Sequence, residues 1–228
     1  MKHTSNSKNT TDFSSALQQG IQVLGLEDVG AEQQDKLLHY IDLLVQWNKV
    51  YNLTAVRNPA EMLTHHVLDS LAIIAPLRKH TQGRALPLLD VGSGGGLPGV
   101  VIAICCPEIQ VTCVDAVAKK TAFIQQVAGM LVLPNLKVVH ARVETITAPH
   151  AVIVSRAFAS LADFTQWSAA ALASDGVWLA MKGKHPVDEI EVLPKSVDVF
   201  HVEQIQVPGL DAERCLVWMR PVASGMDP

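Results

Sequence analysis

Long hydrophobic runs are missing from this chain of 228 residues. No apolar stretch reaches the roughly 18 residues that a membrane-spanning helix needs. The first residues, MKHTSNSKNTTDFSS, are polar and contain no hydrophobic core of a secretory signal peptide. The sequence therefore predicts a cytoplasmic protein. Its hydrophobic content of 49% can fill the core of one large domain or of one domain with a helical extension.

Cysteines and metal-ligand spacings are also scarce. The chain has 4 Cys, which form neither a disulfide framework nor a paired metal-ligand pattern. None has the exposed position beside a base that a nucleophilic thiol requires. We interpret all of them as small core residues, namely Cys105, Cys106, Cys113 and Cys215. The histidines show no H-x-x-x-H pair with an acidic base, so no metal site is predicted.

Glycine, by contrast, is concentrated in the segment LPLLDVGSGGGLPG, residues 86–99. Its first part predicts a buried parallel strand, in which Asp90 can hydrogen-bond the turn that follows. The glycines at positions 92, 94, 95, 96 and 99 permit positive φ and let a ligand approach the backbone. Pro98 suits the start of the next helix. We expect a nucleotide-like cofactor at this turn, although a tight turn that binds nothing is the plainer alternative.

The spacing of these glycines bears on which cofactor is bound. The dinucleotide pattern G-x-G-x-x-G fails when it starts at Gly92, because Leu97 occupies its third glycine position. It fits when it starts at Gly94, so a nicotinamide cofactor stays open. The pattern G-x-G-x-G at Gly92, Gly94 and Gly96 resembles instead the first motif of S-adenosylmethionine-dependent methyltransferases.

An acidic residue follows the next expected strand. Residues 111–114 are rich in β-branched side chains and end at Asp115, about twenty positions beyond the glycine turn. Doubly wound folds place an acid there against ribose hydroxyls. The alternative is that Asp115 only caps the expected helix of residues 117–131. With the glycine turn upstream, ribose binding is favoured.

The order of expected elements predicts an α/β fold. Helix 119–131, strand 136–140, strand 152–155, helix 161–173 and strand 177–181 follow the turn in sequence. Residues 197–207 and 215–222 flank the turn-rich segment Pro208-Gly209-Leu210-Asp211 and predict an antiparallel hairpin. Such a hairpin closes the seven-stranded, mostly parallel sheet of the Rossmann-like class I methyltransferase fold.

Helical periodicity at residues 31–51 and again at 59–76 predicts an N-terminal helical extension to the sheet. We divide the chain into a disordered tail at 1–12, the extension at 13–80 and a methyltransferase domain at 81–223. The extension and the domain are expected to form one compact unit.

The family resemblance is carried by four runs. They are WNKVYNLTAVRNPAEMLTHHVLDSL from Trp47, LLDVGSGGGLPGVVIAI from Leu88, VSRAFASL from Val154 and MKG from Met181. In this order they resemble the RsmG (GidB) family, over roughly residues 30 to 220. The resemblance implies a bacterial methyltransferase that uses S-adenosylmethionine to modify N7 of a guanosine. By the same resemblance, the guanosine is expected in the decoding-region loop of 16S ribosomal RNA, and the expected partner is this RNA within the small ribosomal subunit.

The resemblance also implies site residues. The cofactor contacts are expected at Gly92, Leu97, Val143, Glu144 and Arg156, in addition to the motif glycines Gly94 and Gly96 and to Asp115. The residues expected to place the substrate are Asn52, Arg57, His66, Asp69, Ser70 and Lys182. Arg156 and Lys182 are the positioning candidates. Without the family, Glu144 is equally well a helix-start acid and Arg156 a partner in a salt bridge.

The implied chemistry needs no general base. Guanine N7 has an in-plane lone pair and no proton, so it can attack the sulfonium methyl directly, and alignment dominates catalysis. The chain accordingly lacks the Asn/Asp-Pro-Pro-aromatic motif that holds exocyclic amines. Three alternatives stay open: an oxidoreductase using NAD, a ribosome-assembly factor that keeps the cofactor site for stability, and a methyltransferase acting on a small molecule.

Excess positive charge is absent as well. The net charge is -4 and the pI is near 6.1, values that are not typical of an RNA-binding protein. Local clusters can still form a phosphate-binding rim if they meet around the cofactor. The candidates are Arg57, His65, His66, Lys119, Lys120, Arg142, Arg156, Lys182, Lys184 and His185. Taken singly, the two adjacent lysines are more often a solvated helix face.

Overall fold

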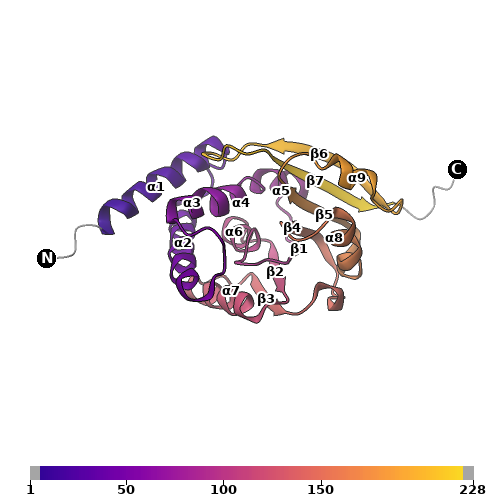
Figure 1. Ribbon diagram of the computed structural model, residues 1–228, viewed down its shortest axis with the longest axis horizontal. Coiled ribbons are helices and arrows are strands. Elements are labelled where there is room, and N and C mark those ends of the chain that lie inside the picture. Colours follow the sequence, from indigo (N-terminus) through magenta and orange to yellow (C-terminus); the bar gives the residue numbers. More distant parts are fainter. Residues whose placement is uncertain (1–5, 223–228) are drawn as a thin grey trace.

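The computed structural model describes residues 6–222, with side chains from Phe13 on, and contains a sheet of 7 strands (Figure 1). The strands are β1 (Pro87–Val91), β2 (Gln110–Asp115), β3 (Leu136–His140), β4 (His150–Arg156), β5 (Leu172–Lys182), β6 (Val197–Ile205) and β7 (Arg214–Pro221). Their order is β3-β2-β1-β4-β5-β7-β6. The first five strands pair in parallel, and β7 runs antiparallel to both of its neighbours. The predicted C-terminal hairpin is confirmed.

The helices that follow the sheet's strands are α6 (Gly99–Cys105), α7 (Ala118–Met130), α8 (Leu161–Ser168) and α9 (Val187–Glu191). Short 3-10 turns, η2 (Val143–Thr145) and η3 (Ala169–Ala171), follow β3 and α8. The alternation of side chains along β1 divides the core into two layers. Leu88 belongs to the layer with the extension, α6 and α7, whereas Leu89 belongs to the layer with α8. Both faces of the sheet are therefore covered, which explains the nearly continuous burial of β1.

The extension consists of α1 (Asn6–Val23), α2 (Ala31–Tyr51), α3 (Pro59–Met62), the π-helical segment η1 (Leu63–Leu68), α4 (Asp69–Leu71) and α5 (Ile74–Thr81). The helix predicted at residues 31–51 is confirmed. A single hydrophobic cluster runs from Leu17 in α1 to Trp218 in β7 and so includes both the extension and the sheet.

Two expectations about boundaries were wrong in part. The disordered tail was expected at residues 1–12, but α1 begins at Asn6, because adding residues to a formed helix costs little; residues 1–5 lie outside the described part. The helix expected at 161–173 ends as α8 at Ser168, and β5 already begins at Leu172. Leu172 pairs with His150 of β4, so tertiary pairing overrides the helical propensity of the alanines before it.

Candidate functional site

The glycine turn after β1 has backbone angles that favour glycine. Gly92, Gly94 and Gly96 have φ values of +64°, +58° and +89°. The amides of Gly92 and Ser93 donate to the carbonyl of Val114 at 2.9 and 3.2 Å. These bonds attach the turn to the end of β2.

Side chains from β1 and α2 hold the same turn. Asp90, fully buried, accepts a hydrogen bond from the amide of Gly99 at 2.9 Å, as expected for an acid beneath the turn. The hydroxyl of Tyr40 in α2 donates to the carbonyl of Gly95 at 2.5 Å. Burial raises the pKa of Asp90 to about 7. The extension thus takes part in fixing the turn.

Asp115 has both carboxylate oxygens engaged. Oδ2 accepts from the amide of Gly94 at 2.9 Å, and Oδ1 accepts from the amide of Val117 at 2.8 Å. The second bond orders the residues just before α7, whose N-cap residue, Val117, makes no side-chain capping bond, so Asp115 links the glycine turn to the approach of this helix. Asp115 also lines a cavity, in which a ribose could reach the remaining lone pairs.

Two cavities meet above the carboxyl ends of the strands. The smaller has a volume of about 300 Å³ and the larger about 580 Å³. Gly92, Lys120 and Ala157 line both of them, so the glycine turn forms part of their common boundary. In doubly wound sheets this edge is where ligands bind.

The structure brings most of the predicted site residues to these cavities. Asp115, Val143 and Glu144 line the smaller cavity. Those that line the larger cavity are His66, Asp69, Gly94, Leu97, Arg156 and Lys182. Gly92 lines both.

Four predicted site residues lie outside the linings of both cavities. A Cβ at Gly96 would lie 2.4 Å from Cγ2 of Val100, so Gly96 allows close packing under the turn. Asn52 and Arg57 are exposed and hydrogen-bond each other at 3.1 Å. Ser70 is fully buried in α4, and its hydroxyl has no partner among the described residues. Direct substrate contact by these three residues stays a prediction that the cavity geometry does not favour.

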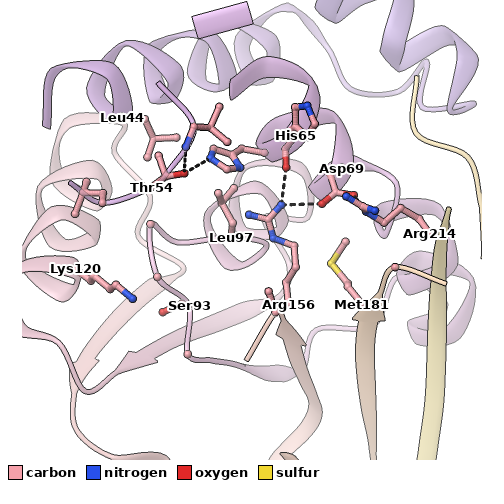
Figure 2. Close-up of a pocket in the computed structure, with 18 of the residues that line it drawn as sticks. Leu44, Thr54, His65, Asp69, Ser93, Leu97, Lys120, Arg156, Met181 and Arg214 are labelled. Carbon is pink, nitrogen blue, oxygen red and sulfur yellow. Dashed lines mark hydrogen bonds and ion pairs between the residues drawn. The ribbon is translucent and has the colours of Figure 1, made fainter. Parts of the chain in front are cut away.

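A buried carboxylate at the start of α4 joins two arginines, as Figure 2 shows. Nη1 of Arg156 lies 2.8 Å from Oδ2 of Asp69, and Nε of Arg214 lies 2.8 Å from Oδ1. The same Nη1 of Arg156 donates to the carbonyl of His65 at 2.9 Å. The salt bridge considered for Arg156 therefore exists, and it lies on the cavity wall.

Sequence reasoning missed Arg214. The residue lies at the first position of β7, where the neighbouring Cys215 pairs with Lys182 at the end of β5. Because β7 is antiparallel, its beginning lies at the same edge as the ends of the parallel strands. The predicted hairpin contained this signal, since its register against β5 brings Arg214 to the site.

His66 is buried beside this group. Its Nε2 lies 2.7 Å from the hydroxyl of Thr54. Burial, together with the positive charge of Arg156, lowers the pKa of His66 to about 4. The ring is consequently neutral near pH 7, so His66 adds no cation to the expected basic rim.

Lys182 has its ammonium group fully engaged. Nζ donates to both carboxylate oxygens of Glu189 in α9, at 2.9 and 2.8 Å, and to the carbonyl of Ala159 at 3.0 Å. An ammonium has only three protons to donate. Lys182 therefore anchors α9 to the end of β5, and its expected contact with substrate would require one of these bonds to break.

The four cysteines are all buried, as predicted, and none of them lines either cavity. Burial raises the pKa of Cys106 to about 11 and that of Cys113 well above its usual value. Between residues 6 and 222, no three His, Cys, Asp or Glu side chains form a group suited to a metal ion. Among the helices of that range, none is both long and apolar enough to cross a membrane.

The sheet order, the antiparallel seventh strand and the glycine turn after β1 define the Rossmann-like fold of class I methyltransferases. The fold resembles that of magnesium protoporphyrin IX methyltransferase from Synechocystis PCC 6803, solved with bound SAM. That structure has a TM-score of 0.59 and 11% identity, and the match covers 79% of this chain and 97% of that one.

The particular family follows from sequence comparison. The family model for rRNA small subunit methyltransferase G matches residues 33–217. A protein of Acidovorax sp. strain JS42 named ribosomal RNA small subunit methyltransferase G is 63% identical to this chain, and the match covers 94% of this chain and 98% of the relative. The protein of the same name from Polaromonas sp. strain JS666 is 64% identical, over 92% of this chain and 96% of the relative. The chain belongs to the rRNA small subunit methyltransferase G family, which decides against the nicotinamide-dependent oxidoreductase.

Proposed function

We propose that this methyltransferase transfers a methyl group from S-adenosylmethionine to N7 of a guanosine in 16S ribosomal RNA, within the small ribosomal subunit. The observation that carries the proposal is the pair of cavities that meet at the glycine turn, because methyl transfer needs a cofactor and an acceptor side by side. Ribosomes work in the cytoplasm, so we propose that location for the enzyme.

The residues of the smaller cavity fit a nucleoside. Val143 is a buried apolar residue, and Phe158 and Trp167 present aromatic rings 5.8 Å apart in an edge-to-face arrangement. Such a wall suits an adenine base. Asp115 supplies carboxylate oxygens for the ribose hydroxyls, and Glu144 adds a second acceptor.

The glycine turn fits the methionine part of the cofactor. A Cβ built on Gly94 meets nothing closer than the carbonyl oxygen of Gly92 at 3.9 Å, so it would project into the larger cavity that Gly94 lines. The absence of that side chain leaves room for a ligand against the backbone. Arg156, at the end of the adjacent strand β4, provides a cation for a carboxylate.

The larger cavity suits an acceptor that needs no deprotonation. Asp69 is its one lining carboxylate among the described residues, and both of its oxygens are held by arginines. His66 also lines the cavity, but its pKa is lowered to about 4, so its neutral ring is a weak base. The cofactor supplies an electrophilic methyl group, which a lone pair such as that of guanine N7 can attack directly. Leu97, Arg156 and the turn would align the base with that methyl group, so their contribution is positioning.

The test incubates the purified enzyme with methyl-labelled S-adenosylmethionine and small ribosomal subunits that lack the modification. The RNA is then digested, and the labelled nucleoside is identified by mass spectrometry. Label in 7-methylguanosine is the expected result. Label in another nucleoside, or no label while S-adenosylhomocysteine still binds, would refute the assignment of the acceptor.

A variant links the reaction to the site. Arg156→Lys should lower cofactor affinity or turnover without unfolding the protein, because a lysine cannot reproduce the two contacts of Nη1 together with a free guanidinium edge. Arg220→Lys on the exposed end of β7 is the matched control and should keep the rate of the unsubstituted enzyme. Equal kinetics in all three proteins would remove Arg156 from the site.

A further inference from the structure

Arg214 has hydrogen-bonding capacity that its structural role does not use. Its Nε donates to Asp69 at 2.8 Å and its Nη1 to the carbonyl of Glu213 at 2.9 Å. Nη2 has no partner among the residues that the structure describes. A guanidinium carries five N–H donors, and those of Nη2 stay available to a ligand.

The charge of the buried group is also unbalanced. Arg156 and Arg214 share the single carboxylate of Asp69, so one positive charge is left without a counter-ion in the wall of the larger cavity. The side chains of these arginines are only 17% and 23% exposed. A partly desolvated cation of this kind favours an anionic ligand, and a guanidinium edge matches the oxyanions of carboxylate and phosphate.

The place of Arg214 in the sheet distinguishes between these two anions. Arg156 ends β4, the strand next to the glycine turn, whereas Arg214 begins β7, which lies beyond β5. Strands are about 4.8 Å apart, so the backbone of Arg214 lies roughly 14 Å along the sheet from the turn that would hold the cofactor. Its side chain returns to Asp69, where it meets Arg156, but it approaches from the side away from the glycine turn (Figure 2). This direction of approach suits Arg156 to the cofactor carboxylate and the outer edge of Arg214 to the acceptor.

Lys182 cannot fill this role as it stands. It lies on β5, between the two arginine-bearing strands, but its ammonium is already bound to Glu189 and Ala159. Lys120, the remaining cation in the wall, lies on α7 beside Asp115 and hence on the cofactor side. Arg214 is left as the cation with free donors on the side of the acceptor.

We propose that Arg214 binds a phosphate of the ribosomal RNA and so holds the target nucleotide in the larger cavity. This inference rests on the proposed function and extends it, because it names a residue that contacts the phosphate backbone of the acceptor. Asp69 orients the guanidinium through Nε and leaves the outer edge with Nη2 for the phosphate.

The test measures small-subunit and cofactor binding separately in the Arg214→Gln protein. Loss of one charge-assisted contact should weaken the affinity for unmodified small subunits about tenfold. It should also reduce the slope of log affinity against log salt by about 0.7, the contribution of one phosphate on a single strand. The affinity for S-adenosylhomocysteine, measured by calorimetry, should stay the same.

The control is Arg220→Gln, which removes an arginine from the same strand at its exposed end, where it pairs with Asp198 at 2.9 Å. It should bind subunits and cofactor as the unsubstituted enzyme does. Arg214→Lys, which keeps the charge, guards against a folding defect. It should keep the salt slope while the affinity for subunits falls, because the planar fork is lost.

Two results would overturn the proposal. Weaker S-adenosylhomocysteine binding with unchanged subunit binding would assign the oxyanion to the cofactor carboxylate. A lower melting temperature with both affinities unchanged would restrict Arg214 to holding Asp69. Methylation by the unsubstituted enzyme is followed in parallel, so a failure of the proposed reaction is recognised independently of the salt slopes.

Discussion

Replacing Asp69 with alanine removes the carboxylate that two arginines share. Asp69 comes from the extension, whereas Arg156 and Arg214 come from strands β4 and β7 of the sheet. Both ion pairs have nitrogen-to-oxygen distances of 2.8 Å, and the aspartate side chain is only 5% exposed. The substitution therefore leaves two like charges close together, in a place where water reaches them poorly.

The size of the loss follows from this burial. Removing one partner of a buried ion pair costs about 3 to 5 kcal/mol, because the remaining charge is left without compensation. The arginines are partly exposed and can recover some hydration, so we expect about 3 kcal/mol, at the lower end of that range. For a chain of this size, such a loss lowers the melting temperature by roughly 6 to 12 °C.

The assay is unfolding in urea, compared with calorimetric melting of the same protein. Asp198→Ala is the control, because it removes the acid of an exposed ion pair of similar length, 2.9 Å to Arg220, whose aspartate is 42% exposed. That loss should stay below about 1 kcal/mol. If Asp69→Ala cost no more than the control, the arginines would be fully hydrated, and the uncompensated charge in the cavity wall would not exist.

Two further predictions concern the turn and the effect of pH. Gly92→Ala should abolish tight binding of S-adenosylhomocysteine in a calorimetric titration, because a Cβ would lie 2.2 Å from Cδ2 of Phe158. The control is Gly83→Ala, which has a similar φ of +68° but open space around the new Cβ, and it should bind normally. The pKa of His66 is lowered from 6.5 to about 4, so its contribution to the stability of the fold is lost as the pH falls. The pKa of Asp90 is raised from 3.8 to about 7, so its contribution is lost as the pH rises. The free energy of unfolding in urea should therefore be measured between about pH 4.5 and 6.5. It should rise more steeply with pH in Asp90→Asn than in the unsubstituted chain, and less steeply in His66→Gln. A change of slope of the same sign in both variants would contradict these assignments.

Much of the site could be predicted because it depends on short-range sequence signals. Gly92 and Val143 follow parallel strands and Asp115 is the last residue of one, and the ends of parallel strands meet at one edge of the sheet. The glycine pattern, the succession of helices and strands along the chain and the final hairpin could therefore be predicted from local motifs and from periodicity.

The remaining features depend on contacts between distant segments. Lys182 was a natural candidate for substrate binding, but Glu189 of α9 neutralises it, and nothing in the sequence near Lys182 shows that α9 folds back over it. Arg214 was missed for the converse reason, since its position depends on the antiparallel register of β7 against β5. The alanines before Leu172 favour a helix locally, and only the pairing with β4 extends β5 to that point.

The wall of the larger cavity is drawn from nearly the whole described chain, from Leu44 in α2 to Arg214 at the start of β7. During synthesis, the acceptor side of this wall cannot form until Arg214 has emerged from the ribosome, because β7 must insert between β5 and the strand made before it. A chain that stops short of this point lacks Arg214 of the wall and Trp218, which belongs to the hydrophobic cluster shared by the extension and the sheet. Removal of β7 should therefore disturb the packing of the extension and the wall of the larger cavity together, because this one strand contributes to both.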